Sequence, residues 1–465
     1  MDTQNEPQPS SQVPEVNNNT NAAPVPNGGL PGANQPPATA TAPPAPVEQA
    51  PTPPAGSGPA SGGLPPDSTP PGQPPTSPTP PPSGASGEAP KKSKKLPMLI
   101  LIVIIILVVL GGGFYFMKHQ QKKPKPAANI KVGLMMAFSG GSSAMGFGTS
   151  KGVALAKKAL NANNITVVQA DSKCDPQAAL KAVNQLVQQH VAAIIGDGCS
   201  SASLAALPIA NNNQIPMISP SASSTKLSIP NDYFFRVIPN DNQQGAFMAE
   251  TVYNKGIKKT AIFYTNEPYG ASIQQAFQDK YESLGGKVVA TAIAQPNVIN
   301  ISTQIASLKA AHPDAIFFAP NSVTSGIAAV KLAHQDGIKV PYFGADVFYD
   351  QSIITNAADA VEGMTFTTFP TGTAAFKQSV ATAYPNDGQL YAAPESYDAF
   401  KAIYLATQKG ASTGQQIKNM LPSIKFTGVS ADNVSFNQFG DLSTSGTNYK
   451  YALFNVKGGK FEQLN

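Results

Sequence analysis

Along residues 128–465, short apolar runs alternate with longer segments in which apolar residues recur periodically. Short uncharged apolar runs such as Val191–Ile195 follow segments such as Ala178–Gln189, in which apolar residues recur every three to four positions. The apolar runs predict strands that are buried on both faces, and the intervening periodic segments predict amphipathic helices. Strands that alternate with helices are typical of parallel sheets with crossover connections. The pattern therefore predicts an α/β fold.

This alternation occurs in two successive series. The first extends from a strand at Ile130–Met136 to one at Phe234–Val237, and the second from Thr260–Tyr264 to Gly363–Thr368. Two series predict two doubly wound, Rossmann-like lobes, and the remaining C-terminal segment should cross back between them as a multi-crossing hinge. The expected boundaries are, for lobe 1, about 128–240 and 370–445 and, for lobe 2, about 241–369 and 446–465.

The N-terminal region has a different composition. Residues 1–90 contain 26 of the 44 prolines and no lysine, arginine or aromatic residue, so this segment cannot bury enough apolar surface to fold. We expect residues 1–95 to form a disordered Pro-rich tail with a lysine-rich end. It is either a solvated spacer or a docking site for a Pro-binding partner.

An apolar segment follows this tail. Residues Leu96–Met117 carry no charge over 22 positions. A helix of this length reaches about 33 Å, which exceeds the roughly 30 Å hydrocarbon core of a bilayer. The sequence therefore predicts one transmembrane helix at 96–117, followed by a linker at 118–127.

Lysines flank both ends of this segment, so charge alone does not orient it. The two cysteines of the chain, Cys174 and Cys199, are 25 positions apart in the folded region, which fits a single disulfide in an oxidising compartment. We therefore expect a cytoplasmic tail and an extracytoplasmic folded domain at the cell membrane.

Composition and motifs argue against several functions. The net charge of +5 arises largely from lysines beside the apolar segment, so it does not indicate nucleic-acid binding. Gly146, Gly148 and Gly152 match a dinucleotide fingerprint poorly, because the spacing is one residue too long. The four histidines lie outside the expected cleft, and no hydrolase, zinc or Walker motif is present. We predict no enzyme activity, no cofactor and no metal.

Hydroxyl residues follow two of the predicted strands of the first lobe. Ser200 and Ser201 come directly after Cys199, and Ser219–Ser224 follow the next strand. In parallel sheets ligands bind beyond the carboxyl ends of the strands, where free N–H groups at helix starts suit a carboxylate. These serines are therefore candidate ligand contacts.

Several short motifs, in order, resemble those of the type 1 solute-binding proteins of ABC importers, specifically the Leu/Ile/Val-binding family. The resemblance covers residues 128–465, and together the motifs are specific although each alone is weak. They lie at Asp171–Pro176, Ile195–Ser201, Met217–Pro220, Asp241–Gly245, Tyr269–Gly270, His312–Ile316, Gly344–Asp346, Ala360–Gly363 and Tyr397–Ala399.

The resemblance implies a site that holds the two ends of an amino acid separately. Ser200 and Ser223, with the backbone of Ser221, would hold the α-carboxylate. Asp346 would hold the α-ammonium, and Tyr269 would line the pocket from the second lobe. Each also has a structural alternative, since a serine can cap a helix, an aspartate can be a solvated loop acid and a tyrosine can be ordinary packing.

Two positions depart from the family pattern. Met145 stands where the family often has an aromatic residue, and Asn321 lies where it often has Gly-Gly-Tyr. These departures concern the pocket around the ligand side chain and leave the carboxylate and ammonium contacts in place.

The resemblance implies a monomeric binding domain that captures an amino acid, branched-chain or related, by lobe closure and delivers it to an ABC permease. The alternative is a ligand-sensing receptor that signals through a partner bound to the Pro-rich tail.

Overall fold

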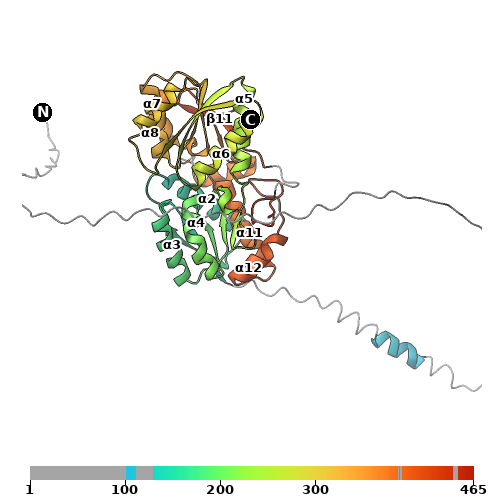
Figure 1. Ribbon diagram of the computed structural model, residues 1–465. Coiled ribbons are helices and arrows are strands. Elements are labelled where there is room, and N and C mark those ends of the chain that lie inside the picture. Colours follow the sequence, from blue (N-terminus) through green and yellow to red (C-terminus); the bar gives the residue numbers. More distant parts are fainter. Residues whose placement is uncertain (1–100, 111–128, 386, 388–389, 444–448) are drawn as a thin grey trace, which may run out of the picture. The chain divides into compact units, whose positions relative to one another are not determined.

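The computed structural model describes residues 101–110 and 129–465, apart from 386, 388–389 and 444–448 (Figure 1). The predicted tail at 1–95 and linker at 118–127 lie outside these residues. Of the predicted span at 96–117, residues 101–110 are described, and they form a helix with exposed apolar side chains. Among the described residues, no helix is both long and apolar enough to cross a membrane.

Lobe 1 is built on a five-stranded sheet in which every neighbouring pair is parallel, with the order β2-β1-β3-β4-β5. The short strands β3 and β4 are buried along their whole length, as their uncharged sequences predict. The strands are β1 (Ile130–Met136), β2 (Ile165–Asp171), β3 (Ala193–Gly196), β4 (Met217–Ser219) and β5 (Phe234–Arg236).

The helices of lobe 1 come from two parts of the chain. The first three alternate with the strands, while three later helices return to the same lobe and pack there, where α11 lies against α2 (Figure 1). They are α2 (Ser143–Ala159), α3 (Pro176–Gln188), α4 (Ser200–Asn212), α10 (Ala374–Ala383), α11 (Ala393–Gln408) and α12 (Gly414–Met420).

Lobe 2 is built on a seven-stranded sheet with the order β12-β11-β10-β9-β8-β6-β7. Strands β6 to β10 are parallel, whereas β11 and β12 add an antiparallel hairpin at one edge. The strands are β6 (Lys259–Thr265), β7 (Lys287–Ala294), β8 (Ala315–Ala319), β9 (Tyr342–Gly344), β10 (Thr365–Thr368), β11 (Ala452–Lys457) and β12 (Lys460–Gln463). The helices are α5 (Asp241–Asn254), α6 (Pro268–Ser283), α7 (Ser302–Ala310), α8 (Val323–Gln335) and α9 (Gln351–Ala357).

The predicted α/β fold with two lobes is confirmed, and several elements differ in detail. Strand β6 extends one residue beyond Thr260–Tyr264 at each end, β10 begins two residues after Gly363, and the hairpin β11–β12 follows the second predicted series. Helix α5 begins at Asp241, with Asn240 as its N-cap. Helix α2 begins at Ser143 and includes the three glycines of the near-match to a dinucleotide fingerprint.

Two glycines of α2 allow a close approach of the chain around the start of α11. A Cβ on Gly148 would lie 2.3 Å from the carbonyl oxygen of Tyr391, and one on Gly152 would lie 2.0 Å from that of Ala393. Glycine lowers helix propensity, but here it allows the start of α11 to pack directly on α2. These glycines therefore serve helix packing, and the fingerprint spacing that they nearly match has a structural cause.

The single arginine of the chain anchors the end of lobe 1. Arg236 is fully buried, and its Nε donates to Asp441 Oδ1 at 2.7 Å. Its Nη1 donates to the carbonyl oxygens of Ala222 and Ser224 at 3.1 and 2.9 Å, and its Nη2 donates to Ser228 Oγ at 2.6 Å. One guanidinium thus ties β5, the loop after β4 and the last segment of lobe 1 together.

Replacing Asp441 with asparagine should destabilise the fold strongly. The variant keeps the shape of the side chain but leaves the buried guanidinium without a counter-charge, which costs about 3–5 kcal/mol. Urea unfolding should show this loss. The matched control is Glu462→Gln, which removes an exposed pair with Lys457 and should change the free energy of unfolding by less than about 1 kcal/mol. Equal, small effects of both variants would contradict the anchoring role of Arg236.

Candidate functional site

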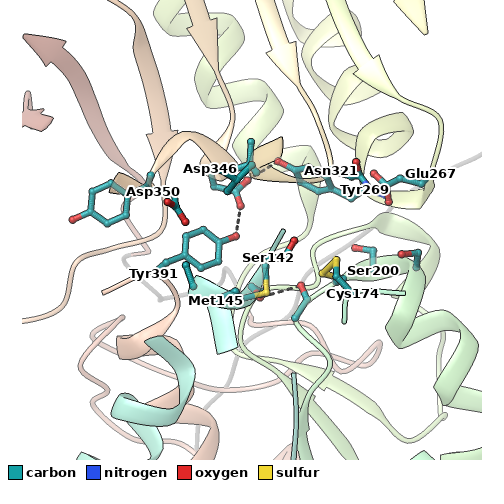
Figure 2. A pocket seen from close by; sticks show the side chains of 18 residues that line it. Ser142, Met145, Cys174, Ser200, Glu267, Tyr269, Asn321, Asp346, Asp350 and Tyr391 are labelled. Atoms are coloured by element: carbon teal, nitrogen blue, oxygen red, sulfur yellow. Dashed lines mark hydrogen bonds between the residues drawn. A yellow bond between two sulfur atoms is a disulfide. The ribbon is translucent and has the colours of Figure 1, made fainter. Parts of the chain in front are cut away.

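A cleft of about 650 Å³, counting the part that is open to solvent, is lined by residues of both lobes. Its walls come from the carboxyl ends of the strands and from the helix starts that follow them (Figure 2). Six of the predicted ligand residues line it, namely Met145, Ser200, Ser221, Tyr269, Asn321 and Asp346.

The start of α4 forms part of the lobe 1 wall. Its N-cap, Cys199, makes no side-chain capping bond, so the helix start offers backbone N–H groups and the positive end of its dipole. Ser200 Oγ accepts a hydrogen bond from the backbone N–H of Ser224 at 3.1 Å, which leaves its own hydroxyl hydrogen free to donate. The arrangement suits a carboxylate.

The other two predicted serines are placed differently. The Ser221 hydroxyl lies 3.0 Å from the carbonyl oxygen of Gly198, to which it donates. Ser223 is 1% exposed and is not one of the lining residues, although its carbonyl oxygen accepts from the backbone N–H of Asp241 at 2.9 Å. Among the three serines, Ser200 therefore has the best geometry for a ligand, and the role of Ser223 stays a prediction.

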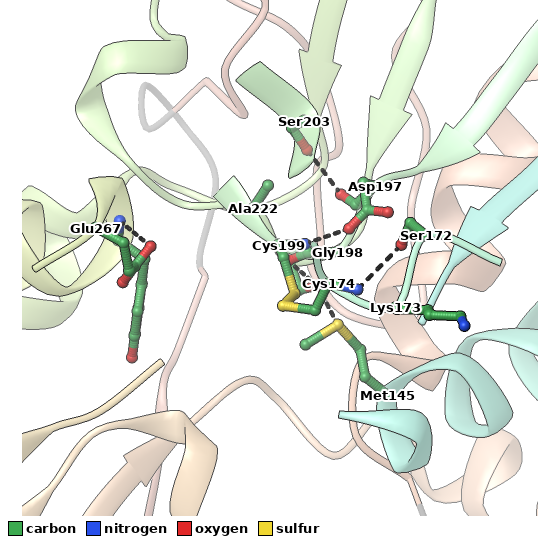
Figure 3. The surroundings of a disulfide bond; sticks show 12 residues. Met145, Ser172, Lys173, Cys174, Asp197, Gly198, Cys199, Ser203, Ala222 and Glu267 are labelled. Atoms are coloured by element: carbon green, nitrogen blue, oxygen red, sulfur yellow. Dashed lines mark hydrogen bonds between the residues drawn. A yellow bond between two sulfur atoms is a disulfide. The ribbon is translucent and has the colours of Figure 1, made fainter. Parts of the chain in front are cut away.

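The predicted disulfide between Cys174 and Cys199 is confirmed and lines the cleft (Figure 3). Buried Asp197 supports the turn beside it, since its Oδ1 accepts from the backbone N–H of Cys199 at 2.7 Å. Met145 lies against the same turn, where a Cβ on Gly198 would come within 2.2 Å of its Sδ. The disulfide and this glycine together shape the entry to α4.

Asp346 is the centre of a hydrogen-bond network on the lobe 2 side. Its Oδ1 accepts from the Tyr269 hydroxyl at 2.6 Å and from Gln244 Nε2 at 3.1 Å. Its Oδ2 accepts from the hydroxyl of Tyr391, which belongs to the segment before α11 (Figure 2). Burial and the nearby Asp346 charge raise the pKa of both tyrosines well above the ordinary value, so both hydroxyls remain donors.

Three residues of this site were not among those singled out from the sequence. Gln244 and Tyr391 bind Asp346, and Glu267 lines the cleft as the N-cap of α6. Glu267 accepts from the backbone N–H groups of Tyr269 and Gly270 at 2.9 and 2.5 Å. Proline at the first helical position marks a helix start, so the position of Glu267 directly before Pro268 could have been recognised from the sequence.

The lining of the cleft contains acidic residues and no basic ones. Glu267, Asp346 and Asp350 line it, and the lining residues include no lysine, arginine or histidine. Within the described part of the chain, no three His, Cys, Asp or Glu side chains are grouped as metal ligands.

Comparison with known families identifies a matching family model. The periplasmic binding protein family matches residues 129–460.

Curated relatives are binding proteins rather than enzymes. The Leu/Ile/Val-binding protein of Escherichia coli K12 is 26% identical over 249 residues, which are 52% of this chain and 68% of the relative. A leucine-, isoleucine-, valine-, threonine- and alanine-binding protein of Pseudomonas aeruginosa is 26% identical over 287 residues, covering 58% and 74% of the two chains.

Solved structures share the fold. The leucine-binding protein of Thermotoga maritima has a TM-score of 0.66 at 24% identity and covers 72% of this chain and 98% of its own. A branched-chain amino acid transporter substrate-binding protein of Streptococcus pneumoniae, in complex with isoleucine, has a TM-score of 0.64 at 27% identity, with the same coverage. The resemblance to branched-chain amino-acid binding proteins is confirmed.

Glu267 should make stability depend on pH. Burial raises its pKa to about 7, from 4.5, although hydrogen bonds from Gly270 and Tyr269 oppose the shift. The folded state therefore holds a proton that the unfolded chain has lost, so this contribution to stability is complete below about pH 4.5 and disappears as the pH rises through 7. We expect urea unfolding at several pH values to show that the free energy of unfolding falls less with rising pH in Glu267→Gln than in the wild type. Glu282→Gln, at an exposed position of α6, is the control, and its free energy of unfolding should depend on pH as that of the wild type does.

Removing the disulfide should lower stability. Cross-linking two positions 25 residues apart stabilises the fold by about 3 kcal/mol in the chain-entropy model, so Cys174→Ser should lower the melting midpoint. Dithiothreitol should lower the wild-type midpoint to that of the variant and leave the variant unchanged. If neither the substitution nor dithiothreitol changes the melting midpoint, the cross-link does not contribute to stability.

Proposed function

Since the chain belongs to the periplasmic binding protein family, we propose that it captures a free amino acid in its interlobe cleft and delivers it to an ABC transporter permease. The proposal rests on the observation that one wall of the cleft suits a negatively charged group and the opposite wall suits a positively charged group. The uncapped start of α4 suits an anion, and the carboxylate of Asp346 suits a cation. A zwitterion presents both.

The carboxylate end of the ligand would meet Ser200 and the first N–H groups of α4. Its ammonium would meet Asp346, whose two oxygens offer about four acceptor positions. Three are taken by Tyr269, Gln244 and Tyr391, which leaves room for a donor from the ligand. Those three bonds hold the carboxylate in place before the ligand arrives, so little further ordering is required.

Contacts between the lobes support capture by closure. The bond from Tyr391 to Asp346 joins the segment before α11 to lobe 2. On the other side of the cleft, the backbone N–H of Thr225 donates to Ser272 Oγ at 3.1 Å, and the Ser224 hydroxyl donates to the carbonyl oxygen of Pro268 at 2.9 Å. The two lobes can therefore hold each other directly around a small ligand, and lobe motion would control its entry and release.

The names of the relatives favour an amino acid, branched-chain or related, as the ligand. We further propose that the apolar segment at 96–117 tethers the domain to the cell membrane, with the Pro-rich tail in the cytoplasm and a monomeric domain outside. The uncharged 22-residue sequence supports the tether, which would raise the effective concentration of the domain at the transporter.

A ligand screen tests the proposed function. A solute that binds only the folded state must raise the melting midpoint, so thermal unfolding in the presence of each of the twenty amino acids should reveal at least one that shifts it. Sugars serve as the negative set. No shift with any amino acid, in folded protein freed of carried-over ligand, would refute amino-acid capture.

Replacing Asp346 with asparagine should weaken amino-acid binding. The variant keeps the size of the side chain but leaves the ammonium without a counter-charge, which should cost about 2 kcal/mol or more of affinity. Isothermal titration with an amino acid found in the screen measures this loss. Asp359→Asn, at an exposed position of lobe 2, is the control and should bind like the wild type. Unchanged affinity in the Asp346 variant would remove this residue from the site.

A further inference from the structure

Asn321 lies at the edge of the cleft beside the Asp346 network. It follows the end of β8, and Asp346 follows the end of β9, the strand next to β8 in the sheet. The turn is fixed by Ser322, the N-cap of α8, whose Oγ accepts from the backbone N–H of Ser325 at 3.3 Å. Asn321 is therefore presented to the cleft by a defined turn (Figure 2).

The amide oxygen of Asn321 lacks a hydrogen-bond donor. Its Oδ1 is buried, and no described residue donates to it. A buried acceptor without a partner destabilises a protein, and nearly all such atoms in folded proteins are paired. An unpaired acceptor at the wall of a ligand cleft is accounted for if the ligand supplies the donor.

We propose that Asn321 is a specificity-determining residue that selects amino acids whose side chain carries a neutral hydrogen-bond donor, a hydroxyl or a carboxamide. This inference rests on the proposed function, because it assumes that the ligand is an amino acid. A buried ammonium is best matched by a carboxylate, and Asp346 provides one. The neutral amide of Asn321 then remains for a neutral donor on the side chain.

The surroundings of Asn321 favour the same class of ligand. Val323 and Val347 also line the cleft and offer apolar contacts for the aliphatic part of a side chain. Asp346 and Asp350 line it as well, and no lining residue is cationic, so an acidic side chain would be repelled. A short side chain with both a methyl and a hydroxyl group, as in threonine, fits this combination.

Threonine and valine form the decisive pair of ligands, because they have nearly the same shape and differ by a hydroxyl in place of a methyl group. Isothermal titration of the full-length protein should give at least about tenfold tighter binding of threonine, since only threonine pairs the buried acceptor. Equal binding, or tighter binding of valine, would overturn the specificity proposal and leave amino-acid capture intact. Binding of no amino acid would refute the proposed function itself.

The variant Asn321→Leu tests the residue. Leucine is close to asparagine in size and has no acceptor, so the variant should lose most of the preference for threonine while valine binds as before. Asn419→Leu, at an exposed position of α12, is the control and should keep the preference. An equal loss for both ligands would assign Asn321 to the shared ammonium and overturn the proposal. If Asn321→Leu does not fold, Asn321→Ala is measured in the same way. The comparison of threonine with valine in the wild-type protein tests the proposal without any variant.

Discussion

The buried guanidinium of Arg236 is the contact on which the arrangement of lobe 1 depends. A charge that is fully removed from water is tolerated only with a counter-charge and with acceptors for its remaining N–H groups. Asp441 supplies the charge, and carbonyl oxygens of the loop after β4 supply acceptors. The same loop carries Ser224, whose backbone N–H binds Ser200. The position of the best-placed hydroxyl in the cleft is thus linked to a structural ion pair.

On the lobe 2 side of the cleft, the hydrogen bonds of Asp346 link the ligand site to the contact between the lobes. The residue is 5% exposed, and its carboxylate accepts from three donors, which belong to α5, α6 and the segment before α11. Because one of these donors belongs to the part of the chain that packs on lobe 1, recognition of an ammonium and contact between the lobes share a single side chain. A ligand that completes this network would favour the closed arrangement by its differential affinity for the two states.

Local sequence was most informative where backbone and burial dominate. The strand β1 begins and ends where the sequence pattern placed it, because a mostly apolar run leaves few alternatives. The family motifs located Ser200, Tyr269 and Asp346, and the structure brings all three to one cleft. The glycines of α2 disfavour a helix locally, and the close packing of α11 on α2 accounts for them.

The sequence by itself determined the α/β class, the two lobes, the disulfide pair and the family of the chain, since each depends on period, composition or short motifs. Only the tertiary structure decided which hydroxyls remain free, that Tyr391 and Gln244 hold Asp346, and that the Asn321 oxygen lies unpaired at the cleft. Gln244 and Tyr391 are 102 and 45 positions away from Asp346 along the chain. Hydrogen-bond partners over such separations are set by how the lobes pack, and no local pattern encodes them.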